Sequence, residues 1–155
     1  MPWYEARIQS KWALQLLKTQ QIKGALPALR SSKGRIIITS SGAAVSSYTA
    51  WGAYGAAKAA LNHLAGTLAA EEPDVTTVAI RPGTVDTEMQ RELREIHHKT
   101  MAEKDARKFA DLKTTGTLLK PEQPGHVIAR VALAAPKELS GRFINWSEIE
   151  GFQED

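Results

Sequence analysis

The stretch Gly34-Arg35-Ile36-Ile37-Ile38-Thr39-Ser40-Ser41 decides the fold of this 155-residue chain. Its three consecutive isoleucines predict a strand buried on both faces, as in parallel sheets. A segment rich in alanine and leucine, Ala50 to Glu71, follows and predicts a long helix that Pro73 ends. Val75-Thr76-Thr77-Val78-Ala79-Ile80 is a second strand of the same type. Because strands joined by a long helix are parallel, the sequence predicts the α/β class.

The rest of the chain continues this alternation. Apolar residues at helical spacing predict a first helix from Ala6 to Leu29, and Ser31–Gly34 forms a turn before the first strand. Pro82-Gly83 ends the second strand. After it come a charged helical pattern, a helix, a third strand and an acidic tail that we expect to be frayed, at Asp86–Leu112, Pro121–Ala135, Gly141–Trp146 and Ser147–Asp155.

The composition excludes several classes of protein. Hydrophobic residues make up 43% of the chain, too many for a disordered protein. With no cysteine, disulfides, thiolate zinc sites and thiol nucleophiles are excluded. The net charge of +3 is mild and spread along the sequence, which favours solvated surface over nucleic-acid binding. No apolar run approaches the ~20 residues of a membrane span, and Met1–Arg7 lacks a signal-peptide core, so we expect a cytoplasmic protein that binds neither membrane nor nucleic acid.

Tyr54 and Lys58 are the residues most indicative of chemistry. They lie four positions apart in a predicted helix and so project from one face. An unperturbed tyrosine hydroxyl has a pKa of about 10, too high for an efficient acid at neutral pH, and a nearby ammonium group lowers that pKa by stabilising the phenolate. The pair therefore indicates proton transfer, although a Tyr-x-x-x-Lys pair alone also fits a solvated helix.

Three segments converge on one edge of the predicted sheet. Ligands of parallel sheets bind beyond the carboxyl ends of the strands. Ser40-Ser41 and Pro82-Gly83-Thr84 follow two such ends, and Tyr54 lies near the start of the helix between them. Ser41 and Thr87 are also ordinary helix-cap residues, and capping is compatible with a place in a site.

Together these residues resemble the classical short-chain dehydrogenase/reductases over roughly Gly24 to Trp146. The family spacing is matched by Ser41, by Tyr54-x-x-x-Lys58 and by Pro82-Gly83-x-x-x-Thr87. The sepiapterin-reductase-like and benzil-reductase-like branch is more similar still, on the segments Ser40-Ser41-Gly42-Ala43, Trp51-Gly52-Ala53-Tyr54-Gly55, Lys58-Ala59-Ala60-Leu61-Asn62-His63, Glu71-Glu72-Pro73 and Val85-Asp86-Thr87-Glu88-Met89-Gln90.

The resemblance implies the C-terminal portion of a Rossmann-type doubly wound parallel sheet, with about three parallel strands and flanking helices. It implies one truncated domain over residues 1–155, in which 1–23 match weakly, 24–146 are family-like and 147–155 form a tail. The implied activity is NAD(P)H-dependent reduction of a small ketone, diketone or pterin-like carbonyl. NADP(H) is favoured over NAD(H), and no metal is implied.

The same resemblance implies a role for each site residue. Tyr54 is the general acid in carbonyl reduction and also one of the cofactor-binding residues. Lys58 assists it and binds the nicotinamide ribose, and Ser41 holds the substrate oxygen. Residues of the segment Pro82–Thr87 bind the cofactor: the Val85 backbone and the Thr87 hydroxyl hold the carboxamide, and Gly83, after Pro82, lets the backbone approach the ring.

Two further groups of residues have simpler interpretations. His97-His98 lies in a charged helical pattern and is expected to be solvated, with no metal ligand spacing around it. In the family, the corresponding segment forms the substrate lid. Its apolar residues therefore fit either the core or the pocket lining: Met89, Leu93, Met101 and Phe109.

The N-terminal half of the family has no counterpart in this sequence. None of the eleven glycines forms the Gly-x-x-x-Gly-x-Gly turn that holds the cofactor pyrophosphate, and Leu14 stands where a further catalytic asparagine is expected. The strand Ile36–Ile38 would then be an open apolar edge that favours association. A reductase impaired on its own is the first hypothesis. The second is a catalytically inactive fragment that forms homo-oligomers or pairs with a full-length relative through the Ala-rich helix Ala50–Ala70.

Overall fold

The structure is a computed structural model that describes residues 19–153. Its centre is a parallel sheet in the order β1-β2-β3, with strands at Arg35–Thr39, Thr76–Arg81 and Phe143–Asn145. In the register, Ile37 pairs with Val78 and Ile80 with Ile144. The α/β class and the three parallel strands predicted from the sequence are therefore confirmed. Leu14 and the part of the predicted first helix before Thr19 lie outside the described residues.

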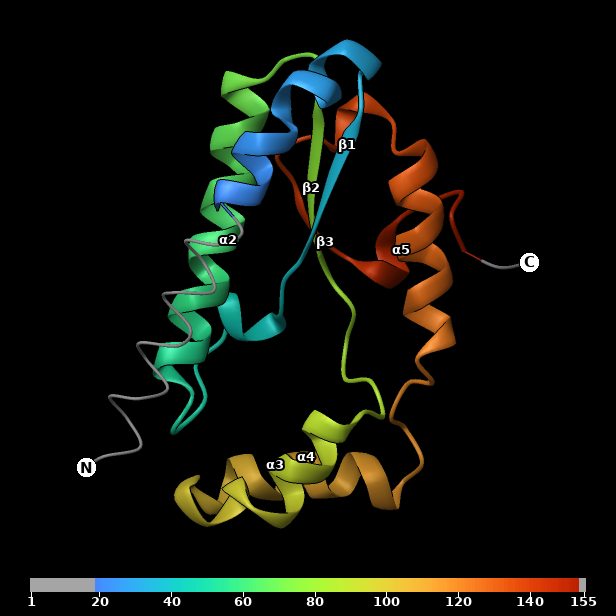
Figure 1. Cartoon of the computed structure of the whole chain (residues 1–155). Coiled ribbons are helices and arrows are strands. Elements are labelled where there is room, and N and C mark those ends of the chain that lie inside the picture. The colour runs from blue at the N-terminus through green and yellow to red at the C-terminus, as the bar shows by residue number, and fades with distance from the viewer. Residues whose placement is uncertain (1–18, 154–155) are drawn as a thin grey trace.

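Helices cover both faces of the sheet (Figure 1). The helix over residues 19–32 and α2, Gly52–Glu71, lie on one face, and α5, Glu122–Ala134, lies on the other. Beyond the carboxyl ends of the strands, α3, Glu88–Glu95, and α4, Glu103–Thr114, form a separate helical lobe. No helix among residues 19–153 is long and apolar enough to cross a membrane.

The hydrophobic core has one layer on each face, because side chains alternate along a strand. Val78 and Ile80 of β2 pack toward α5, whereas Ala79 packs toward α2. The central strand β2 is buried along almost its whole length. The edge strand β1 is different: Ile36 and Ile37 are half-buried, so the expectation of burial on both faces is wrong for part of this strand.

Three local predictions need correction. Residues 31–32 are still helical, and the turn begins at Lys33. The charged segment Asp86–Leu112 is interrupted by a 3₁₀ turn at His97–Thr100, and the two helices on either side fold back so that Leu93 and Phe109 are buried in one cluster. The acidic tail is not frayed up to residue 153: Ile149 is 1% exposed and belongs to the core around α5.

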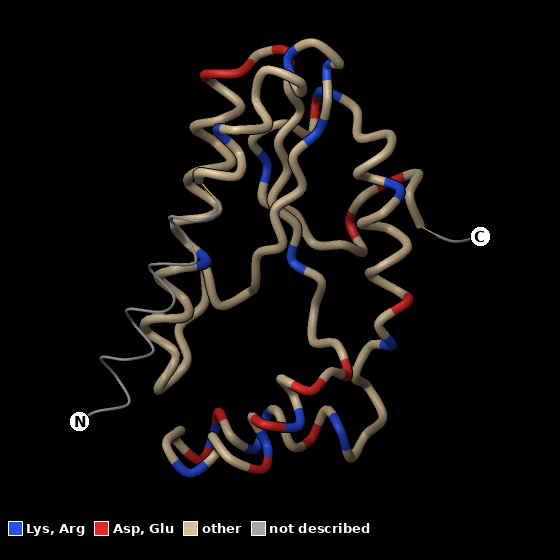
Figure 2. Tube along the Cα trace, in the orientation of Figure 1, with Lys and Arg blue, Asp and Glu red and all other residues tan. Residues whose placement is uncertain are grey.

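Charged residues gather along the α3–α4 lobe, and α2 carries few (Figure 2). On the lobe, Arg91 is paired with Glu88 and Glu95, and Arg107 with Glu103. Each pair spans three or four positions along one helix and is exposed, as expected for a solvated helical surface.

An ion pair between Arg30 and Glu72 joins the helix over residues 19–32 to the end of α2. The Arg30 guanidinium donates to both Glu72 oxygens, at 2.7 and 2.6 Å, and this hydrogen bonding holds the pKa of Glu72 below its usual value near 4.5. A folded-state pKa below the unfolded one stabilises the protein above about pH 4.5, and this stabilisation is lost as the pH falls through the folded-state pKa.

We therefore expect Glu72→Gln to lower the free energy of unfolding at pH 7 and to make less difference as the solution is acidified below pH ~4.5. Urea unfolding at several pH values between 7 and 3 measures this. Glu71→Gln, at the exposed neighbouring position, is the matched control. A destabilisation by Glu72→Gln that is equal at every pH would contradict the prediction.

Candidate active site

The turn that follows β1 places Ser41 at the carboxyl edge of the sheet. Ser41 has extended backbone angles and caps the 3₁₀ turn Gly42–Ala44 (η1), where its Oγ accepts a hydrogen bond from the Ala43 N–H at 3.2 Å. Ser41 therefore does cap a helical turn, which the sequence allows as one of its roles. The half-buried Ser41 keeps a hydroxyl proton for a further acceptor, since a hydroxyl can accept and donate at once.

Tyr54 and Lys58 lie one turn apart on α2, as their spacing predicts. The Lys58 Nζ lies 5.8 Å from the centre of the Tyr54 ring and donates a hydrogen bond to the Thr39 carbonyl oxygen at 2.8 Å. The Tyr54 ring also meets Trp51 edge-on, with ring centroids 5.2 Å apart. The structure therefore brings the phenol and the ammonium group together and anchors the ammonium group two residues before Ser41.

Close packing of α2 on η1 sets Ser41 beside the first turns of this helix. At Gly55, directly after Tyr54, an added Cβ would lie 2.7 Å from the Ala43 carbonyl oxygen. Real Cβ atoms do not approach a backbone oxygen so closely. Glycine at this position therefore allows the contact between the helix that carries Tyr54 and the turn that Ser41 caps.

The segment after β2, Pro82–Thr87, is held in place by residues that are distant in the sequence. Gly83 has a φ of +76°, which favours glycine, and its missing Cβ leaves room for Leu119 and Trp146. Leu119 forms a parallel bridge with Val85: the Asp86 N–H donates to the Leu119 oxygen at 2.8 Å, and the Leu119 N–H donates to the Thr84 oxygen at 3.0 Å.

In a parallel bridge the flanking residues make the hydrogen bonds, so the N–H of the bridged residue, Val85, points away from Leu119. On the following residues, the Thr87 hydroxyl donates to the Val85 oxygen at 3.3 Å, and Asp86 forms an ion pair with Lys113 at 2.8 Å. The predicted cofactor segment is therefore held by the bridge to Leu119 and the ion pair with Lys113.

The α3–α4 lobe docks on residues 48–51, directly before α2. The Thr49 N–H and hydroxyl donate to Asp105 Oδ2, at 2.8 and 2.6 Å, and these hydrogen bonds lower the pKa of Asp105 below its usual value. Trp51 and Phe109 stack with ring centroids 5.1 Å apart. An apolar cluster thus continues from the lobe to the aromatic neighbour of Tyr54.

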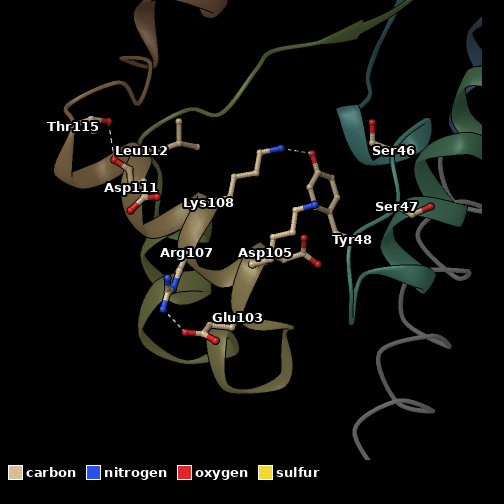
Figure 3. A pocket seen from close by; sticks show the side chains of 11 residues that line it. Ser46, Ser47, Tyr48, Glu103, Asp105, Arg107, Lys108, Asp111, Leu112 and Thr115 are labelled. Atoms are coloured by element: carbon tan, nitrogen blue, oxygen red, sulfur yellow. Dashed lines mark hydrogen bonds and ion pairs between the residues drawn. The ribbon is translucent and has the colours of Figure 1, made fainter.

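A groove lies between residues 46–48 and α4 (Figure 3). Lys108 crosses it and donates to the Tyr48 hydroxyl at 2.9 Å. Its lining is mostly polar and charged: Ser46, Ser47, Tyr48, Glu103, Lys104, Asp105, Arg107, Lys108, Asp111, Leu112 and Thr115. Of the apolar residues left open between core and pocket, Leu93, Met101 and Phe109 are buried in the lobe, whereas Met89 is 57% exposed.

Comparison with known proteins assigns the chain to a family. The sequence pattern described as short chain dehydrogenase matches residues 18–98, more than half of the chain. The chain belongs to the short-chain dehydrogenase family.

Characterised members of the family match more of the chain. Benzil reductase ((S)-benzoin forming) of Saccharomyces cerevisiae is 43% identical over 129 residues, which cover 79% of this chain and 49% of that protein. Sepiapterin reductase of Mus musculus is 36% identical over 119 residues, 74% of this chain and 44% of that protein. This chain thus spans about half the length of these relatives.

A solved structure confirms the fold. The crystal structure of the KRED1-Pglu enzyme superposes with a TM-score of 0.84 and 40% sequence identity, over 88% of this chain and 57% of that one. The three-stranded sheet and its helices are therefore a Rossmann-like portion of a short-chain dehydrogenase, as the sequence motifs indicated.

One buried polar contact of this short-chain dehydrogenase was not anticipated from its sequence. Ser40 is 3% exposed, and its hydroxyl donates to Asn62 Oδ1 on α2 at 2.6 Å. A partial signal was available, since Asn62 follows Lys58 by four residues and shares its helix face, but this spacing does not identify Ser40 as its partner. The bridge at Leu119 and the Thr49–Asp105 contact had no such signal, because each joins segments that lie more than thirty residues apart. No cluster of three metal-ligating side chains occurs among residues 19–153.

Proposed function

We propose that this chain carries the proton-transfer and nicotinamide-binding part of an NADP(H)-dependent carbonyl reductase. The observation that carries the proposal is the contact between α2 and the end of β1, where Lys58 Nζ bonds to Thr39 and lies against the Tyr54 ring. This contact gathers a proton donor, a fixed positive charge and the Ser41 hydroxyl at the edge of a parallel sheet where ligands bind. A cytoplasmic setting goes with the proposal.

The donor set fits the nicotinamide end of the cofactor. The φ of Gly83 turns the backbone at the end of β2, and the Val85 N–H points away from its bridge to Leu119. Val85 and Thr87 would hold the carboxamide, Pro82 and Gly83 would lie along the ring, and Lys58 would hold the ribose hydroxyls. When bound, NADP(H) supplies the hydride.

The side chains of Ser41, Tyr54 and Lys58 then act on the substrate oxygen. Ser41 Oγ–H donates a hydrogen bond to the carbonyl oxygen and polarises it. As negative charge develops on that oxygen, the Tyr54 hydroxyl transfers its proton to it, which gives the alcohol and leaves a phenolate. The Lys58 ammonium group lies beside the ring and stabilises that phenolate. The reverse reaction uses the phenolate as the base.

The names of the relatives suggest the substrate class, small diketones or pterin-like carbonyls. The test is NADPH oxidation with benzil and with sepiapterin, together with calorimetric titration of NADPH and of NADH. NADPH binding with turnover of either carbonyl supports the proposal, and tighter binding of NADH would overturn the cofactor preference. Absence of both binding and turnover in a folded chain would contradict the enzymatic role.

A second candidate function is association with another polypeptide, without catalysis by this chain alone. The half-buried Ile36 and Ile37 of β1 favour it, since half-exposed apolar strands at a sheet edge promote pairing. Sedimentation of the chain alone, and mixed with a full-length member of the family, tests this role. A chain that stays monomeric and does not bind the full-length protein would exclude this role.

A further inference from the structure

Two side-chain hydrogen bonds join α2 to the end of β1. Lys58 Nζ donates to the Thr39 oxygen at 2.8 Å, and Ser40 Oγ donates to Asn62 Oδ1 at 2.6 Å. Tyr54, Lys58 and Asn62 are spaced four residues apart, so they follow one another along one face of the helix. The face that carries Tyr54 is thus tied to the two residues that precede Ser41.

The Ser40–Asn62 bond is well placed to resist movement. Ser40 is 3% exposed, and its backbone N–H donates to the Ile80 oxygen of β2 at 2.7 Å, which fixes it on the sheet. Breaking the side-chain bond would leave a buried hydroxyl without its acceptor, and a hydrogen bond is directional and stronger in a medium of low dielectric.

The apolar contacts of α2 define its rotation less sharply. Its buried side chains are Leu61, Ala65 and Leu68, and the rest of the helix is rich in alanine and glycine. Hydrophobic contact is non-directional, so small side chains permit a small rotation at little cost. The orientation of the helix about its own axis therefore depends on the polar bonds to β1 as well as on the close contact of Gly55 with Ala43.

A small rotation has a large effect at Tyr54. A helix with its side chains is about 10–12 Å in diameter, so the end of a side chain lies about 6 Å from the axis, and a 10° rotation moves it by about 1 Å. A misplacement of about 1 Å in a reacting group can cost about 10²-fold in rate.

We propose that Asn62 is a positioning residue: by accepting the hydrogen bond of the buried Ser40, it fixes the rotation of α2 that holds Tyr54 and Lys58 in place beside Ser41. Its consequence for catalysis rests on the proposed function, but its effect on the geometry of the site does not.

The geometric arm of the test needs no turnover. In ¹H–¹⁵N spectra of the full chain, Asn62→Leu should shift the amide resonances of Ser41, Ala43 and Tyr54, and Asn62→Asp, which keeps an acceptor oxygen, should restore them. Ser40→Ala removes the same bond by a smaller change and should reproduce the shifts even if Asn62→Leu fails to fold. His63→Ala, at the exposed next position of α2, is the matched control and should leave these resonances in place.

The kinetic arm separates positioning from general stability. In the folded protein at a temperature well below its melting point, Asn62→Leu should lower kcat at least tenfold with the KM for the carbonyl changed less than about threefold, and Asn62→Asp should recover most of the loss. Shifts confined to residues next to Asn62, or an unchanged kcat in a destabilised variant, would overturn the proposal. If the wild-type chain shows no turnover while the spectra behave as expected, the proposed function fails and the positioning role stands.

Discussion

Tyr54→Phe is expected to abolish nearly all carbonyl reduction by this chain, with a loss in kcat of about 10²–10⁴-fold. The substitution removes the hydroxyl that gives its proton to the substrate oxygen and keeps the ring that packs edge-on against Trp51. Because the packing stays, the melting temperature should change little, and the calorimetric affinity for NADPH should fall far less than kcat. Steady-state kinetics beside calorimetry and thermal melting give all three readouts.

Tyr48→Phe is the matched control for this experiment. Tyr48 belongs to the same aromatic group, with its ring 5.4 Å from that of Trp51, but its hydroxyl accepts a hydrogen bond from the exposed Lys108. Its loss should weaken one contact between α4 and residues 46–48 and leave proton transfer in place. If Tyr54→Phe retained more than a tenth of the wild-type kcat, or if Tyr48→Phe were the more damaging change, the assignment of the proton donor would be wrong.

Gly55→Ala is expected to destabilise the protein and also to disrupt the site. The added methyl group would meet the Ala43 backbone oxygen at 2.7 Å, so α2 and η1 must move apart. Overpacking of this kind costs about 1–3 kcal/mol. This exceeds the gain of about 0.5–1 kcal/mol that alanine brings over glycine inside a helix. Urea unfolding measures the net loss, and kcat should fall as well because Ser41 is displaced from Tyr54.

Gly66→Ala, five residues before the end of the same helix, provides the opposite case. An added Cβ at Gly66 meets nothing within 4 Å, so only the helix preference remains and the variant should be more stable than the wild type by about 0.5–1 kcal/mol. Stabilisation by both substitutions would mean that α2 and η1 do not touch as closely as described.

Much of the fold was predictable because its signals are local. Three isoleucines in a row, an Ala-rich stretch of helical length and a second β-branched run mark β1, α2 and β2 without any tertiary information. The break at His97–Thr100 was not predictable from periodicity, since helical spacing continues on both sides of it. The burial of Ile149 likewise depends on a partner surface around α5 that the tail's acidic composition does not reveal.

The candidate site divides in the same way. The sequence by itself determined which groups are candidates for the site: Ser41, Tyr54 and Lys58, and the segment Pro82–Thr87, because parallel strands end at one edge of the sheet and side chains four positions apart share a helix face. The tertiary structure alone decided how they are held. The bond between Ser40 and Asn62, the bridge at Leu119 and the contact of Gly55 with Ala43 join segments that are distant in sequence. Such contacts depend on how whole elements pack, and packing is a property of three-dimensional shape that local spacing does not encode.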